Sequence, residues 1–266
     1  MTIPQYYKGV IDASGCLSNA WELIKPNYWM YFGIALLTYV LVACIPCLNV
    51  FLMGPVMGGL YFVSLRAMRG EPVEFGMMFK GFEKFVPLMV VGLIQSVPGI
   101  IYQLFDIPIR VGNVGLDSFT RSRGTRGADF FQQAADPDIA ILGGYLVAII
   151  IVGVVLFIFS ILWAISFAFV VPIVVDNDIS IGDALKLSIR ASWSNVGGLI
   201  VLAILCGLLM FVGAIALCIG MFFVLPVVWV SWAFAYRQVF PDLGPSTAFR
   251  YEPPSPESYG SFGQGM

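Results

Sequence analysis

The chain has 266 residues, a formal net charge of −2 and no histidine. Hydrophobic residues make up 59% of it and charged residues only 11%, whereas soluble domains average about 45–50% apolar and about 25% charged residues. So few charges cannot cover a soluble fold of this length, but a surface that faces lipid does not need them. The acidic balance provides no basic face for nucleic acid, and the lack of histidine excludes His-based triads, His-ligated haem and two-His zinc sites. We therefore predict an integral membrane protein with no nucleic-acid partner, cofactor or metal.

Apolar runs in chain order predict about six transmembrane α-helices, since one crossing needs about 20 apolar residues. The expected spans are 28–47, 48–67, 85–105, 139–175, 196–217 and 219–236. The first two and the last two form tight hairpins, and the long fourth run is interpreted as one tilted helix broken near Pro172. The expected fold is all-α, with a single transmembrane domain over 1–240 and a disordered tail over 241–266.

The distribution of Lys and Arg predicts the orientation in the membrane. Six crossings put both termini on one side, which carries ten of the 14 Lys and Arg residues. The other four, Arg110, Arg121, Arg123 and Arg126, lie in the polar, glycine-rich segment 106–138. Because cytoplasmic loops carry the excess of positive charge, we expect a multi-pass protein of the cell membrane with cytoplasmic termini and an external loop at 106–138. Arg121, Arg123 and Arg126 could contact headgroups or an acidic partner there, or belong to a flexible solvated loop.

The two hairpins resemble each other in sequence. Aligning Pro55 with Pro226 brings further matches: Cys47 with Cys218, Phe51 with Phe222 and Arg66 with Arg237. An amphipathic segment precedes each hairpin, so the repeat units are 17–67 and 181–237. Two crossings separate the units, which makes them parallel repeats related by an axis along the membrane normal. Chance similarity between apolar hairpins is the alternative.

Three segments have the apolar spacing of amphipathic helices and are expected on the cytoplasmic surface. Their predicted apolar faces are Leu17, Ala20, Trp21 and Ile24; Phe75, Phe79 and Phe82; and Ile181, Ala184, Leu185 and Ile189. Ser180 and Asp183 predict a capping box that starts the third helix. These helices could grip headgroups, dock a partner, or simply lead each hairpin back into the membrane.

Two stretches of the chain resemble a known group of proteins. They are Phe169-Val-Val-Pro-Ile-Val-Val-Asp176, followed by Ser180, Asp183 and Trp193, and Gly54-Pro55 through Tyr61, followed by Arg66 and Arg69-Gly70-Glu71. In these stretches the chain resembles a loose group of uncharacterised bacterial multi-pass proteins, which is similar to the membrane domain fused to some glycerophosphodiester phosphodiesterases. The resemblance covers most of 15–240 except 106–138. It implies a six-helix membrane fold and no catalytic residues, and the chain contains no phosphodiesterase domain.

Cys44-Ile-Pro-Cys47 is the most specific local motif, because two cysteines at this spacing can form a disulfide or bind a metal as thiolates. The motif lies in a hairpin turn and not at the helix N-terminus of a βαβ unit, so the usual context of a redox site is missing. A structural disulfide at the external face is a further interpretation, with Cys47 paired to Cys44 or, through the repeat, to Cys218. Free buried thiols are the alternative.

Small and polar residues within the spans provide two more candidate contacts. Gln95, Ser96 and Gln103 lie beside Pro98, where they could line a cavity at a kinked helix or form hydrogen bonds between helices.

Gly54, Pro55, Gly58 and Gly59 form a small-residue face that permits close helix contact. The contact could lie within the chain or at the seam of a homo-oligomer.

These observations favour a non-enzymatic accessory or scaffold subunit that acts by lateral packing, because the sequence has no catalytic constellation and essentially no charge inside the spans. Its partners would be membrane lipids and other membrane-protein subunits or further copies of itself. A carrier or flippase for an apolar or lipid substrate is the alternative, suggested by the repeat and the polar third span. A thiol enzyme built on Cys44 and Cys47 is a third hypothesis.

The orientation can be tested with Phe119→Cys, which lies in the middle of the expected external segment. We expect this cysteine to react with a membrane-impermeant thiol reagent in intact cells. The side of the termini carries ten of the 14 Lys and Arg residues and is therefore expected to be cytoplasmic, which leaves 106–138 outside. The native protein, with its own five cysteines, gives the background. Labelling of a folded variant only after lysis would show that the orientation is the opposite one.

Overall fold

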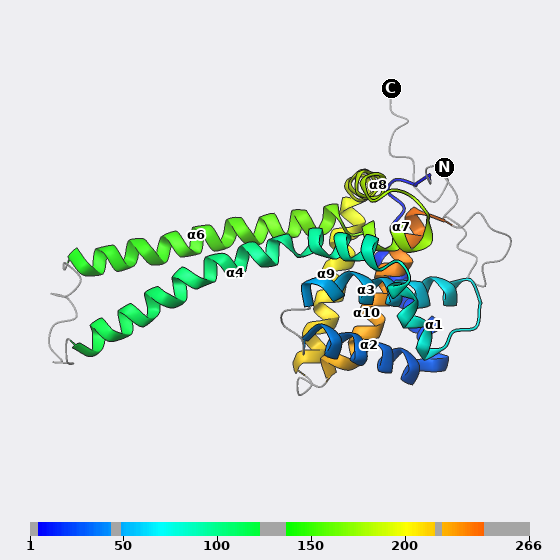
Figure 1. Cartoon of the computed structure of the whole chain (residues 1–266), viewed down its shortest axis with the longest axis horizontal. Helices are drawn as coiled ribbons and strands as arrows, with labels where there is room; N and C mark the ends of the chain where they lie inside the picture. Colours follow the sequence, from blue (N-terminus) through cyan, green and yellow to red (C-terminus); the bar gives the residue numbers. More distant parts are fainter. Residues whose placement is uncertain (1–4, 44–48, 123–136, 216–219, 242–266) are drawn as a thin grey trace, which may run out of the picture. The chain divides into compact units, whose positions relative to one another are not determined.

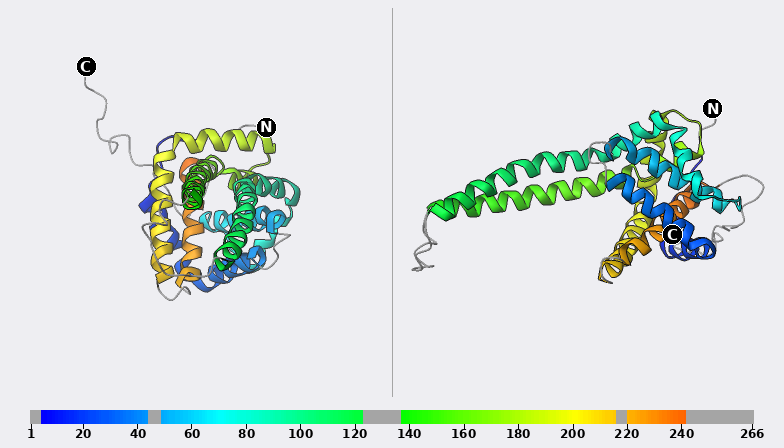
Figure 2. Two further views of the ribbon diagram at one scale, coloured as in Figure 1. Left: turned by 90° about the vertical axis from the view of Figure 1, so that its left-hand side faces the viewer. Right: turned by 60° about the horizontal axis from the view of Figure 1, so that its bottom comes forward.

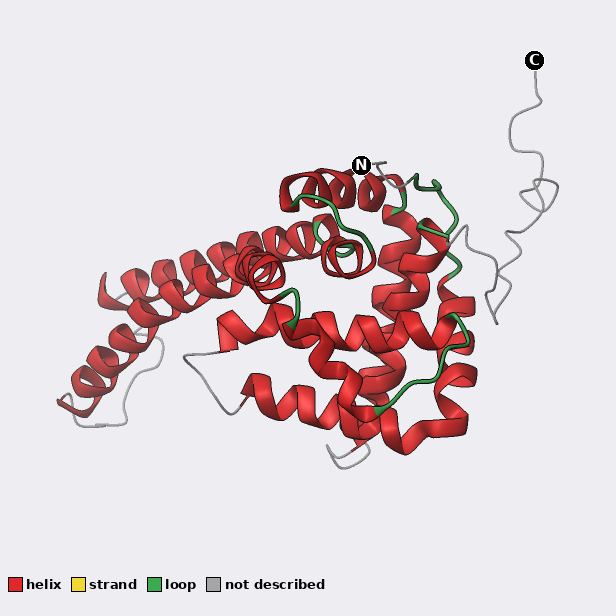
Figure 3. Cartoon of the chain, turned by 45° about the vertical axis from the view of Figure 1, so that its right-hand side comes forward, coloured by secondary structure: helices red, strands yellow, loops and turns green. Residues whose placement is uncertain are grey.

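The computed structural model describes residues 5–43, 49–122, 137–215 and 220–241. These residues form α-helices and 3-10 helices, and the described part contains no strand (Figures 1 and 3), which confirms the all-α class. Within the described ranges, five helices are long and apolar enough to cross a membrane, by length and composition. The chain is thus an all-helical protein of the multi-pass membrane type. The sixth crossing remains a prediction, because α2 has 16 described residues and a crossing needs about 20.

The described elements follow one another with short connections. In chain order they are α1 (Ala13–Ile24), η1 (Lys25–Asn27), α2 (Tyr28–Ala43), α3 (Asn49–Met68), η2 (Phe75–Phe82), α4 (Phe85–Ser122), α6 (Pro137–Ser166), α7 (Val170–Asp176), α8 (Ile181–Ser194), α9 (Val196–Ile215) and α10 (Gly220–Val239). Contacts divide the chain into two compact units, and the single transmembrane domain expected over 1–240 stays a prediction. The first unit comprises the described residues up to Ile94 and from Ile165 onward, and the second comprises Gln95–Ala164.

In the first unit the two hairpins cross each other. Helices α9 and α10 lie side by side, and α10 crosses both α2 and α3 (Figures 1 and 2). Helix α1 packs against α10 and, less extensively, against α9. The short helix α7 packs against α3 and α8, and its residues from Val170 to Val174 are all buried. The core of this unit therefore lies around α7, α10 and α3.

The segment before α1 is fastened to the C-terminal end of α10. The Tyr7 amide donates to the Val239 carbonyl at 2.9 Å, and the Asp12 amide donates to the side-chain oxygen of Gln238 at 2.8 Å. The Asn195 side chain is 3% exposed. It donates to the Tyr7 carbonyl at 2.9 Å and accepts from the Val10 amide at 3.2 Å. These bonds satisfy buried amide groups that would otherwise be costly, and they hold the two described ends of the chain together.

The second unit contains the rest of α4 and most of α6, which run side by side (Figures 1 and 2). The expectation of a loop over 106–138 was wrong for the described part of this segment. Helix α4 continues to Ser122 and α6 begins at Pro137. The glycines and charges of this segment suggested a loop, yet Ile107, Val111 and Val114 have the spacing of one helical face.

The long run over 139–175 is broken near Pro172, as predicted. Helix α6 ends at Ser166 and α7 begins at Val170, so the break comes just before this proline. The Ser188 hydroxyl of α8 donates to the Ser166 carbonyl at 3.0 Å and accepts from the Phe169 amide at 3.3 Å. These bonds satisfy groups that the break leaves without a helical partner. Pro172 lies in the first turn of α7, where proline is tolerated.

The buried faces of the three amphipathic segments coincide with the predicted ones only in part, at Ala20, Ile24 and Ala184. The residues they bury are Ala13, Cys16, Ala20 and Ile24 of α1; Met78 and Gly81 of η2; and Ala184, Leu187, Ser188, Ala191 and Ser192 of α8. In contrast Trp21, Phe79 and Ile189 are exposed. Small residues let helices approach closely, and in lipid large apolar side chains gain nothing by turning inward. The capping box is present, since the Ser180 hydroxyl accepts from the Asp183 amide at 3.2 Å.

The third helices of the two expected repeats share a layout. Helices α3 and α10 each have 20 residues, with proline at the seventh position (Pro55, Pro226) and arginine at the eighteenth (Arg66, Arg237). The helices that precede the hairpins pack differently, because α1 packs on α10 while α8 packs mainly on α7. The repeat of 17–67 in 181–237 therefore remains a prediction.

Helix α3 touches its neighbours through glycine. A Cβ added to any of three glycines would overlap a backbone carbonyl oxygen: Gly54 that of Leu88, Gly59 that of Met78, and Gly81 that of Pro55. A Cβ on Gly58 would meet the Leu88 side chain. The small-residue face is therefore occupied within the chain by η2 and the first turns of α4, which leaves less reason to assign it to a homo-oligomer.

Gly59→Ala should destabilise the protein by about 1–3 kcal/mol, the usual cost of overpacking. The atom that blocks the new methyl group is the backbone oxygen of Met78, which cannot rotate away. Gly76→Ala in η2 is the matched control, because a Cβ there meets nothing within 4 Å. Thermal unfolding in detergent measures the difference, and equal stability of the two variants would contradict the close contact.

Candidate functional site

A largely buried carboxylate joins three helices of the first unit. Asp176, at the end of α7, has a side chain that is 9% exposed. It pairs with Arg69, which follows α3, and accepts from the Arg237 guanidinium of α10 at 3.3 Å. The Tyr236 hydroxyl donates to it at 3.1 Å. Since a buried charge is costly unless it is paired and hydrogen-bonded, Asp176 holds the ends of α3, α7 and α10 together.

A second set of hydrogen bonds caps the C-terminal end of α7. The Lys84 ammonium donates to the Val174 carbonyl at 3.1 Å and to the Asp178 carboxylate at 2.7 Å. The Asn177 side chain donates to the Ile173 carbonyl at 3.2 Å. A cation is favourable at a helix C-terminus, and its hydrogen bond lowers the pKa of Asp178. The cluster is a set of paired charges that fixes helix ends, an arrangement typical of a structural network.

An open groove lies between α1 and the start of α2 on one side and the α9–α10 hairpin on the other. Its volume is about 580 Å³, and its lining residues are Leu17, Ser18, Trp21, Tyr28, Leu209, Phe223, Val224 and Val227. The lining is almost entirely apolar. A hydrogen bond at 2.7 Å from the Tyr28 hydroxyl to the Phe223 carbonyl joins its two walls.

Aromatic rings pack against one another at and beside this groove. The Phe32 and Phe223 rings stack with centroids 4.8 Å apart, and the Trp21 and Tyr28 rings meet edge to face at 6.1 Å. Trp29 lies beside Tyr28 and is 72% exposed. Such aromatic pairs favour offset or edge-on geometry and add to the energy of burial. They hold the start of α2 against the start of α10.

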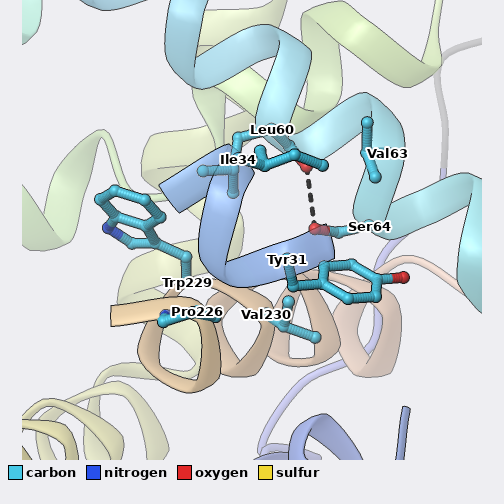
Figure 4. A pocket seen from close by; sticks show the side chains of 8 residues that line it. All are labelled: Tyr31, Ile34, Leu60, Val63, Ser64, Pro226, Trp229 and Val230. Atoms are coloured by element: carbon cyan, nitrogen blue, oxygen red, sulfur yellow. Dashed lines mark hydrogen bonds between the residues drawn. The ribbon is translucent and has the colours of Figure 1, made fainter. Parts of the chain in front are cut away.

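A second, much smaller space lies where α10 crosses α2 and α3 (Figure 4). It measures about 10 Å³ and is lined by Tyr31, Ile34, Leu60, Val63, Ser64, Pro226, Trp229 and Val230. That volume would hold about one water molecule. The Ser64 hydroxyl already donates to the Leu60 carbonyl at 2.8 Å (Figure 4), and most of the other lining groups are apolar. We interpret this space as a packing gap.

The cysteine motif lies outside the described residues, as do Cys44, Cys47 and Cys218 individually. The described cysteines, Cys16 of α1 and Cys206 of α9, are buried and have free thiols. Burial raises the pKa of the Cys16 thiol to about 12, so this group stays protonated and unreactive at neutral pH. Among the described residues no group of three or more Cys, Asp or Glu side chains could hold a metal ion.

The polar residues of the third span do not gather at either cavity. Gln95 and Ser96 are half-buried and Gln103 is exposed, while other residues line the groove and the packing gap. Arg121 of the arginine cluster lies in the last turn of α4. Arg123 and Arg126 lie outside the described residues.

The sequence indicated neither the Asp176 network nor the groove. Asp176 and Arg69 occur in the stretches that carry the family resemblance, but nothing there paired them. The acid at the end of an otherwise apolar run was the available signal, because a charge beside a buried helix requires a partner. No family model, curated protein or solved structure matches the chain.

Asp176→Asn should lower the free energy of unfolding by about 3 kcal/mol, the lower end for a broken buried pair, because Arg69 is 34% exposed. The amide would leave two guanidinium groups without their carboxylate. The neighbouring Asp178→Asn is the control, since Asp178 is 91% exposed and surface pairs contribute little. Denaturation in detergent compares the two, and an equal effect of both changes would show that the network does not hold the helices.

Proposed function

We propose that the chain is a non-enzymatic accessory or scaffold subunit of the bacterial inner membrane and acts by lateral packing. The observation that carries this proposal is the exposed apolar surface of α6. Its large side chains, among them Ile151, Val155 and Phe157, are more than half exposed, and the most apolar window of this span has no buried residue. Lipid can cover such a surface, and so can the helices of a partner subunit.

The first unit supports a static role. The charges around Asp176 are held in pairs, and α3 meets η2 and α4 backbone to backbone at glycine. Packed contacts of this kind do not deform continuously. They suit a subunit that presents a fixed surface better than one whose hairpins slide.

In the proposed topology both termini lie on one side of the membrane, which the bond between Tyr7 and Val239 supports by joining the two described ends of the chain. The distribution of Lys and Arg supports the cytoplasm as that side. The proposed membership in the group of six-helix bacterial membrane proteins agrees with the helical hairpins. Membrane lipids and further subunits, identical or different, are the proposed partners.

A carrier or flippase for an apolar or lipid substrate is the second candidate. The groove between α1–α2 and α9–α10 favours it, because an apolar lining suits a hydrocarbon ligand.

A photoactivatable amino acid placed at Ile151 or Phe157 of α6 tests the scaffold proposal in intact cells. We expect each site to give one discrete crosslinked protein band, because a partner packs on a fixed helix face. The same amino acid at Lys186, exposed on α8, is the control and should not give that band. Lipid adducts alone at both α6 positions would contradict the scaffold and favour the carrier.

A further inference from the structure

We propose that the groove between α1–α2 and α9–α10 binds one acyl chain of a membrane phospholipid as a defined site. The groove lies entirely within the first unit. The inference rests on the membrane location of the chain and not on its role as a scaffold.

The chemistry of the lining selects a hydrocarbon. Two hydroxyl groups belong to the lining, and both donate to backbone carbonyls of the chain itself. Ser18 donates to Gly15 at 3.4 Å and Tyr28 donates to Phe223 at 2.7 Å. A polar ligand would lose its hydrogen bonds to water without gaining these donors, whereas a hydrocarbon has no such loss.

The place of the groove points to lipid as the source of that hydrocarbon. One wall is α9, whose outward residues Ile204, Leu208 and Phe211 are more than half exposed on a helix long and apolar enough to span the membrane. Leu209 carries this apolar surface into the groove. Lipid chains are therefore the surrounding medium at the mouth of the groove.

The size of the groove argues against a helix of a second copy as the occupant. A helix with its side chains is 10–12 Å across, so about 580 Å³ would take only about one turn of it. A lipid chain is far more slender and can follow the groove along α1.

The tryptophans at and beside the groove suggest how the lipid is oriented. Trp29 is 72% exposed and Trp21 is 45% exposed, and both flank the Tyr28 ring. Tryptophan concentrates at the level of the headgroups. The headgroup would therefore lie near Trp29, and the chain would extend past Trp21 toward Leu17.

Photolabelling of the full chain in lipid nanodiscs tests the site. The probe is a phosphatidylethanolamine with a diazirine in the middle of one acyl chain, diluted into the unlabelled lipid. We expect labelled peptides to contain Leu17, Leu209 or Val224 far more often than the exposed residues of α9. Val224→Trp, which fills the groove, should reduce groove labelling several-fold and leave the labelling of α6 unchanged.

Ile204→Trp on the outward face of α9 is the matched control and should leave groove labelling intact. Gel filtration confirms that each variant is folded, and Leu17→Trp replaces Val224→Trp if the latter is not. Labelling in proportion to exposure, the same in all variants, would overturn the proposal. Loss of groove labelling on dimerisation would also overturn it and identify a second copy as the occupant. Neither result bears on the protein crosslinks expected from α6, so this test and that of the scaffold fail separately.

Discussion

A carboxylate removed from water must be neutralised by cations, and Asp176 meets this requirement with residues from distant parts of the chain. Arg69 follows the first hairpin and Arg237 belongs to the second, so their shared acid fixes one hairpin against the other. Helix α7 can be apolar on every side because its charged end is satisfied in this way. The crossing of α10 over α2 and α3 and the groove beside it both belong to the unit that this pairing holds together.

The helical class and the hairpins could be predicted, because long apolar runs leave the backbone in lipid no alternative to a helix. The faces through which the amphipathic helices pack could not be predicted. Hydrophobic periodicity assumes that large apolar residues turn away from water, and it assigned Trp21 and Phe79 to packed faces. With lipid outside, that preference weakens and small residues are favoured at helix contacts, so Cys16 and Gly81 lie inside although the spacing did not select them. The same reasoning explains why Gly54 and Gly59 were recognised correctly as contact residues.

The candidate sites depended on contacts that a single sequence does not reveal. Asp176 and Arg69 are 107 residues apart, and the groove combines residues near the two ends of the chain. A local signal predicted the capping box at Ser180, because this motif depends on a residue only three positions away. In the segment after Phe105, glycine and charge were taken as loop signals, although the apolar spacing there already suited a helix.

The fastening of the N-terminal segment has a consequence for the order of biosynthesis. The amide of Asp12 and its acceptor on Gln238 are 226 residues apart, so α1 leaves the ribosome long before the helix that receives it. Until α10 has been made, the small residues of α1 lack the larger part of the surface that they pack against. Contacts of such separation form late and slowly. Among the described helices, α10 is synthesised last and completes the docking of α1, so a chain interrupted before α10 would expose α1 to quality-control proteases.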